Sequence, residues 1–319
     1  MQSNAGNEHA WPALDYIGWR DTVETFQLWT QIVGKVRLTC SPWLNHGWQV
    51  PLYVNARGLS TSAVHAGGRI FEIDLDLVDH RLVVRTPGAA DLVLALEPMT
   101  VAAFYRRFMD MLDSLGLAVT IDTMPNEVAQ PIRFPEDEVH AAYDAAAVNA
   151  FWRALVQCDR VFKVFRTSFL GKASPVHLFW GALDLAVTRF SGRAAPLHPG
   201  GVPGLPDSVT REAYSHEVSS AGFWPGNERF PQAGFYSYAY PTPQGFAEAR
   251  IEPEAAFWTA DLGEWLLPYD AVRTADDPDA VLLRFLETTY RAVADLAGWD
   301  RGLDCATGVP GRPRPVGGA

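Results

Sequence analysis

The chain has 319 residues, of which 48% are hydrophobic, so it can form one large domain or two medium ones with a complete core. Its 26 basic and 37 acidic residues give a net charge of −11, which repels nucleic-acid phosphates and anionic lipids, so we expect neither a nucleic acid nor a membrane as partner. The three cysteines, Cys40, Cys158 and Cys305, are far apart and odd in number, which argues against a disulfide framework and against a thiolate zinc site.

The two ends of the chain differ in composition from the rest. Residues 1–10 are polar and have neither a basic start nor an apolar run, and residues 301–319 are rich in glycine and proline. Such segments bury too little apolar surface to fold, so we predict that both are disordered. Without a signal-like start or an apolar window of about 18 residues, the protein is expected to be cytoplasmic.

The first half of the chain predicts a helix followed by strands. Asp21 and Glu24 have the spacing of a capping box, and apolar residues at helical spacing continue to about Gly34. Residues 48–55 and 69–79 are predicted strands, the second alternating apolar and acidic side chains. If Asp79 and His80 form a tight turn into the next strand, Asp74 lies opposite Arg85.

The order of elements then repeats. A strand at 91–98 precedes a helix capped by Thr100, and 117–122 is a further predicted strand. From Asp144 we expect a second long helix, strands within 174–193, 235–240 and 264–270, and a last helix capped by Asp277.

Matching residues at separations of 131 to 133 support an internal duplication: Ser41 and Ser174, His46 and His177, Trp48 and Trp180, and Arg57 and Arg189. We therefore predict an α+β protein of two fused, similar halves, 11–135 and 136–300, each an antiparallel sheet with helices packed on one face, sharing one core. The second half carries an inserted loop, 194–224, and long irregular insertions of this kind often hold functional sites.

Several long segments resemble a bacterial family that is known only as a domain of unknown function. They are WTQIVGK, SPWLNHGWQVPLYVNARGL, FEIDLDLVDHRL, FWRALVQCDRVFK, SPVHLFWGALDLAVTRFSGR and AYSHEVSSAGFWPG. The resemblance covers nearly all of residues 11–300. It implies no activity, cofactor or catalytic residue, because none is established for that family.

The densest group of candidate functional residues lies between Ser174 and Trp224. Two imidazoles and a carboxylate on one face can bind iron or zinc and leave positions open for water or substrate. We expect His177, His216 and Glu217 to be the ligands. If 210–219 is helical, Glu212 shares a face with His216 and is the better carboxylate. Asp184 and His198 are reserve ligands.

The sequence leaves three functions open. The first is a metal-dependent enzyme that acts on a small molecule, an oxidoreductase rather than a hydrolase, with Arg189 and Tyr214 as catalytic residues and Arg189 orienting an anionic group. The second is a non-catalytic protein with an aromatic-walled cavity for a small molecule, and the third is a subunit that docks a partner through its inserted loop. The histidines can equally be hydrogen-bonded structural residues. Neither a dinucleotide motif, nor a P-loop, nor a hydrolase elbow is present.

Overall fold

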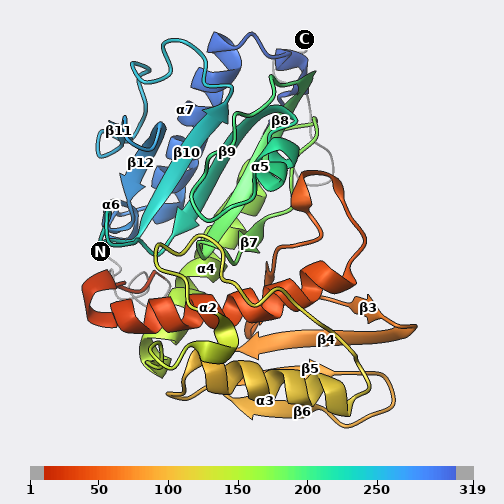
Figure 1. Ribbon diagram of the computed structural model, residues 1–319. Helices are drawn as coiled ribbons and strands as arrows, with labels where there is room; N and C mark the ends of the chain where they lie inside the picture. Colours follow the sequence, from red (N-terminus) through yellow and green to blue (C-terminus); the bar gives the residue numbers. More distant parts are fainter. Residues whose placement is uncertain (1–10, 307–319) are drawn as a thin grey trace.

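Two antiparallel sheets of six strands each organise the computed structural model, which describes residues 11–306 (Figure 1). The chain is therefore of the α+β class, as predicted. Within the described part, helix, strands and helix follow one another in each half: α2 (Tyr16–Cys40) to α3 (Val101–Ser114), then α4 (Ala145–Arg166) to α7 (Pro278–Leu296). A common origin of the two halves stays a prediction, because His46 lies in the short 3-10 helix η1 (Asn45–Gly47) and its proposed mate His177 lies in a strand.

The first sheet consists of β1 (Tyr53–Val54), β2 (Gly58–Ser60), β3 (Val64–Ala66), β4 (Arg69–Asp76), β5 (Arg81–Arg85) and β6 (Leu92–Ala95). The spatial order is β1-β2-β4-β5-β6, and β3 also pairs with β4. The alternation predicted for β4 is present, since Phe71, Ile73 and Leu75 are buried. Residues 117–122, predicted to be a strand, form none.

The turn between β4 and β5 differs from the prediction. Asp76 pairs with Arg81, so the turn contains four residues rather than two, and Asp74 lies opposite Val83. Arg85 still forms an ion pair with Asp74, because a long side chain can reach its diagonal neighbour on the same face. The partner was predicted correctly although the register was not.

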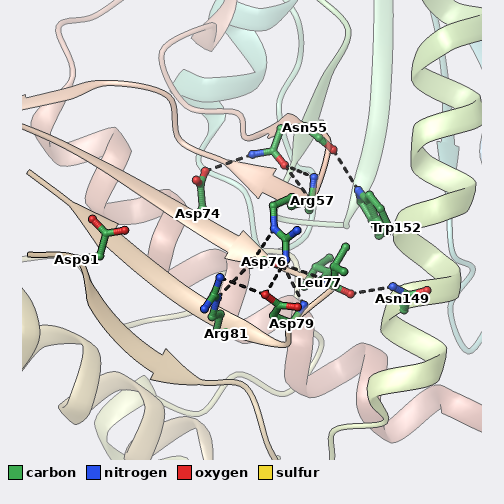
Figure 2. A network of polar contacts seen from close by, with 12 residues as sticks. Asn55, Arg57, Asp74, Asp76, Leu77, Asp79, Arg81, Asp91, Asn149 and Trp152 are labelled. Atoms are coloured by element: carbon green, nitrogen blue, oxygen red, sulfur yellow. Dashed lines mark hydrogen bonds and ion pairs between the residues drawn. The ribbon is translucent and has the colours of Figure 1, made fainter.

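Ion pairs cluster at one end of this sheet, and hydrogen bonds from Asn149 and Trp152 connect the same end to α4 (Figure 2). Arg57 bridges the carboxylates of Asp76 and Asp79 at 2.8 and 2.7 Å. On the α4 side, the amide of Asn149 donates to the carbonyl of Leu77 at 2.9 Å, and the indole of Trp152 donates to that of Asn55 at 3.2 Å. Two acidic side chains of β4, Asp74 and Asp76, are thus paired with arginines within the protein.

The long helix α2 crosses the molecule between the two sheets (Figure 1). It begins before the predicted capping box, after Asp15, and continues through Gly34 to Cys40. Gly34 is required there because any side chain at this position would overlap the indole of Trp180. Two other predicted caps are confirmed: Thr100 accepts from Ala103, and Asp277 accepts from Ala280. Asp144, from which the second long helix was expected, also caps it by accepting from Ala146 and Ala147.

The second sheet has the spatial order β11-β12-β10-β9-β8-β7. Its strands are β7 (His177–Phe179), β8 (Asp184–Ala194), β9 (His216–Trp224), β10 (Gly234–Tyr240), β11 (Phe257–Thr259) and β12 (Glu264–Pro268). One face packs on α4 and α7, and α6 (Tyr269–Arg273) lies between β12 and α7. Backbone hydrogen bonds between Leu52 and Leu178 connect the two sheets, and buried apolar residues from both halves form one cluster.

The segment predicted to be an inserted loop, 194–224, is only partly irregular. Residues 207–213 form α5 (Asp207–Ala213), and 216–224 form the central strand β9. His216 therefore begins a strand and does not share a helix with Glu212. At the carboxyl end, η3 (Arg301–Leu303) and a bridge between Phe169 and Asp304 order part of the predicted tail, while residues 1–10 and 307–319 lie outside the described residues.

Candidate ligand-binding cavity

The two faces of the second sheet have different neighbours. Phe223 of β9 and Phe235 of β10 contact α4 through Phe151 and Phe162, at ring-centroid distances of 6.2 and 6.4 Å. Because side chains alternate along a strand, Tyr236 and Tyr238 point to the opposite face. That face forms the floor of a cavity, which the short helix α5 also lines.

The cavity has a volume of about 690 Å³, within the range of small-molecule sites. Its floor is formed by β7 to β10, its roof by α5 and the preceding loop, and its side walls by the end of α2, the 43–50 loop and the 122–127 segment. Eight aromatic residues line it: Trp43, Trp48, Phe179, Trp180, Phe190, Tyr214, Tyr236 and Tyr238.

Asp184 is held at the floor of the cavity by a contact that spans a strand. Tyr236 pairs with Gly222, and Gly222 pairs with Ala186, two residues beyond Asp184. The Tyr236 ring lies over Gly222, where any side chain would overlap it, and its hydroxyl donates to Oδ2 of Asp184 at 2.5 Å. A glycine in the middle of β9 therefore allows the phenol to reach the carboxylate.

Glu127 enters the cavity from the first half of the chain. Its backbone N–H donates to the carbonyl of Gly204 at 3.1 Å, and its φ of 55° lies in the left-handed region. A Cβ on Gly204 would lie 2.7 Å from that nitrogen, and a side chain on Gly181 would overlap the Glu127 carboxylate. Two glycines thus make room for Glu127 at the cavity wall.

Burial raises the pKa of three carboxyl groups around this floor. It raises that of Asp184 to about 6, although the Tyr236 hydrogen bond acts in the opposite direction. Burial and the charge of Asp184 raise the pKa of Glu127 to about 7 and that of Glu264, on β12, to about 7. Glu127 is exposed, since its side chain faces the cavity, but the protein atoms that line the cavity lie around it and reduce its hydration. Within residues 11–306, no cationic side chain forms an ion pair with any of the three.

A chain of hydroxyl groups continues the polar floor. The hydroxyls of Tyr214 and Tyr238 are 2.9 Å apart, and those of Thr188 and Ser220 are also 2.9 Å apart. Tyr238 and Ser220 lie directly opposite each other on β10 and β9, so the two hydroxyl pairs are neighbours on the floor. Rotating hydroxyls can donate or accept, which lets this floor bind varied polar groups of a ligand.

His46 forms hydrogen bonds with α5, the roof of the cavity. Its backbone N–H donates to the carboxylate of Glu212 at 2.9 Å, and its Nδ1 is 3.3 Å from the carbonyl of Ala213. Nε2 accepts from Lys172 at 2.6 Å, so Nδ1 carries the proton and donates to that carbonyl. His46 has a φ of 60°, a strained conformation for a non-glycine residue, which the contacts with α5 maintain.

His177 is buried in the cavity wall. It is 1% exposed, and its ring lies edge-on to Phe179 at 4.7 Å. Burial, together with the charges of Arg166 and Arg37, lowers its pKa to about 3, so the imidazole is neutral. Among residues 11–306, its Nδ1 has no hydrogen-bond partner, and the atom has almost no accessible surface. A buried polar atom without a partner is unusual.

A family model described as a family of unknown function, DUF5996, matches residues 11–305. The chain belongs to this family. No curated protein and no solved structure matches the chain. The resemblance seen in the sequence is confirmed, and the DUF5996 assignment adds no activity.

The cavity of this DUF5996 member contains four of the eight residues proposed from the sequence: His177, Asp184, Glu212 and Tyr214. His198 lies in the roof, where its Nδ1 accepts from Gly200 at 3.0 Å and its ring stacks on Tyr214. His216 lies beside His46, with ring centroids 5.6 Å apart. Its neighbour Glu217 points to the other face of the sheet and pairs with Arg193 at 2.7 Å.

Arg189 lies outside the cavity. It is 1% exposed and packs on the helix side of β8, between Phe165 of α4 and Tyr290 of α7. Its guanidinium donates to the carbonyl of Phe165 and to the hydroxyl of Ser168. Arg189 therefore has no access to a ligand in the cavity, in contrast to the substrate role expected from the sequence.

Among the described residues, no group of three or more His, Cys, Asp and Glu side chains is arranged to hold a metal ion. No helix in the described part is long and apolar enough to cross a membrane. Sequence analysis missed Glu127, Glu264 and Lys172, because none of them lies in a recognisable motif. The contacts of His46 with α5 fit a hydrogen-bonded structural role, which the sequence had left open for the histidines.

Proposed function

We propose that the protein binds a small organic molecule in the cavity between the second sheet and α5. The observation that carries this proposal is the lining: eight aromatic side chains enclose a polar floor made of Asp184 and a hydroxyl network. Apolar walls with a few oriented polar groups are typical of small-molecule sites. The proposal corresponds to the aromatic-walled binding protein considered from the sequence.

A larger depression, of about 810 Å³, lies between residues 249–256 and the start of α7. Its lining is less suited to a ligand, because Arg284 and Glu252 are already paired there at 3.1 Å. Its aromatic lining is limited to Trp265, which already donates to the carbonyl of Phe246. We therefore place the proposed ligand in the cavity of the second sheet.

The experiment is a fragment screen by saturation-transfer NMR with a cavity-filling control. Ala186 lines the floor and Ser208 lines the roof, so Ala186→Trp and Ser208→Trp each occupy part of the cavity from a different side. We expect fragments to bind the wild-type protein and to lose binding in either variant, with folding verified by circular dichroism. Fragments that bind the folded variants and the wild type equally would contradict the proposal, as would a screen without binders.

A metal-dependent enzyme is the second candidate. It is favoured by the presence of His177, Asp184 and Glu212 in the lining of one cavity. Their arrangement does not form a ready ligand group, so this candidate has less support than small-molecule binding. Elemental analysis tests it: near-stoichiometric iron or zinc that is lost in folded His177→Ala protein would favour the enzyme.

A further inference from the structure

We infer that the ligand of this cavity is an organic cation, an amine carried on an aromatic or apolar body. The inference rests on the proposed function, because it names the class of small molecule that the cavity takes. Three features support it: carboxyl groups without an ion-pair partner among the described residues, the aromatic rings beside them, and the nearby His177, whose Nδ1 has no partner in the same part of the chain.

The carboxyl groups around the cavity fall into two sets. Glu212 accepts the backbone N–H of His46, and Asp122 lies 3.9 Å from the ammonium of Lys35, so both have partners within the protein. Asp184, Glu127 and the adjacent Glu264 have no cationic partner in the part of the chain that the structure describes. Negative charge on them is therefore not neutralised by these residues, and a positively charged ligand would neutralise it.

Aromatic rings stand next to these carboxyl groups. Phe179 pairs directly with Asp184 across β7 and β8, and Tyr236, which binds Asp184, is stacked on Tyr238 at 5.9 Å. The face of an aromatic ring attracts a cation, and the attraction grows when both are removed from water. Carboxylates and ring faces together suit an ammonium group better than either does alone.

His177 provides an independent indication of a ligand. It is 1% exposed, it lines the same cavity, and its Nδ1 is without a partner among the described residues. It lies two residues before Phe179, on the same face of β7. A neutral imidazole can accept a hydrogen bond from an ammonium N–H, and because protein encloses Nδ1 in this conformation, that bond requires the ring to turn towards the cavity.

The negative charge of the cavity and the pH dependence of affinity distinguish a cation from other classes of ligand. An anion would be repelled by Asp184 and Glu127, which share one cavity. A neutral alcohol can donate to a carboxylate and accept from a carboxylic acid, so its affinity should change little with pH. With a pKa of about 6 for Asp184 and about 7 for Glu127, the affinity for a cation should increase from pH 5 to pH 8.

The test is isothermal titration with three probes of similar size: tryptamine, the alcohol tryptophol and the acid indole-3-propionate. We expect tryptamine to bind wild-type protein at pH 8 at least about tenfold more tightly than tryptophol, and its affinity to fall towards pH 5. Asp184→Asn and Glu127→Gln should each weaken tryptamine about ten- to hundredfold and leave tryptophol nearly unchanged. The matched control is Glu217→Gln, a charge removal on the opposite face of the same sheet, with no expected effect on tryptamine.

The titration and the fragment screen together distinguish a failure of the cation inference from a failure of the proposed function. If tryptophol or indole-3-propionate binds as tightly as tryptamine, the cation inference is overturned while small-molecule binding stands. If none of the three binds, the inference is overturned, and the fragment screen with the cavity-filling variants decides the proposed function. Should Asp184→Asn fail to fold, Glu127→Gln alone carries the test, because Glu127 lies in a connecting segment. An unchanged tryptamine affinity in folded Glu127→Gln protein would also overturn the inference.

Discussion

Tyr236 on β10 donates a hydrogen bond to Asp184 on β8 across the whole width of strand β9, with an O···O distance of 2.5 Å. Hydrogen bonds between side chains two strands apart are possible only where the strand between them carries no side chain on that face. Gly222 meets this condition, and the contact it allows places a buried carboxyl group at the centre of the cavity floor.

Gly222→Ala should break this contact. The added methyl group overlaps the Tyr236 ring and displaces it, so we expect a loss of stability of about 1 to 3 kcal/mol and weaker ligand binding. Urea unfolding measures the stability. In a Tyr236→Ala background the methyl group meets no ring, and the same substitution should cost much less. An equal cost in both backgrounds would show that the ring contact is not responsible.

Asp184→Asn should stabilise the protein at alkaline pH. The pKa of Asp184 is raised from 3.8 to about 6, so the folded state holds this proton more tightly than the unfolded chain does. Its contribution to stability is therefore lost as pH rises from about 4 to 6, and above pH 6 the ionised group costs up to about 3 kcal/mol, at about 1.4 kcal/mol per pKa unit. Asparagine keeps an acceptor for Tyr236 without this cost. Urea unfolding at pH 8 and pH 4 should show a gain that is confined to pH 8.

His177 should stay neutral under mildly acidic conditions. Its pKa is lowered from 6.5 to about 3. Between these two pH values the imidazole binds a proton in the unfolded chain but not in the folded state. Stability from this group is full above pH 6.5 and is lost as pH falls towards 3. We expect its ring signals to show no titration between pH 8 and pH 5 by NMR, and His177→Gln to reduce the loss of stability on acidification. A titration midpoint near 6.5 would contradict this.

Glu212→Ala should loosen the roof of the cavity. The substitution removes the acceptor for the backbone N–H of His46, whose strained φ depends on contacts with α5. A hydrogen bond worth about 1 kcal/mol corresponds to about fivefold faster hydrogen exchange in residues 207–213. Glu212→Gln keeps an acceptor oxygen and serves as the control, with exchange close to that of the wild type. Equal acceleration in both variants would assign the effect to the charge instead.

Arg189→Ala should distinguish a structural role of Arg189 in the core from a role in orienting a substrate. The side chain fills space between Phe165 and Tyr290 and bonds a backbone carbonyl, so its removal should destabilise the protein by about 2 to 4 kcal/mol. Tryptamine affinity of the folded fraction should not change, because Arg189 and the cavity lie on opposite faces of β8. Weaker tryptamine binding without a loss of stability would instead support a role for Arg189 in orienting a substrate.

The helices and most strands could be predicted because their signals are local. The caps Thr100, Asp144 and Asp277 lie within three residues of the N–H groups that they bind, and the alternation in β4 repeats every second residue. The four-residue turn after Asp76 could not be predicted, because a tight turn and a longer one fit the same alternation when they differ by two residues. The start of α2 was missed for a related reason, since a capping-box pattern can also occur inside a helix.

By itself, the sequence determined the α+β class, the order of the elements, the family and a region rich in candidate residues, since periodicity, caps and motifs are properties of neighbouring residues. Only the tertiary structure decided which candidates share a cavity. Arg189 and Thr188 are adjacent, yet strand geometry sends one into the core and the other to the cavity. Glu127 and Asp184 are brought together by the packing of a connecting segment against a distant turn, and such long-range contacts leave no pattern in the residues on either side.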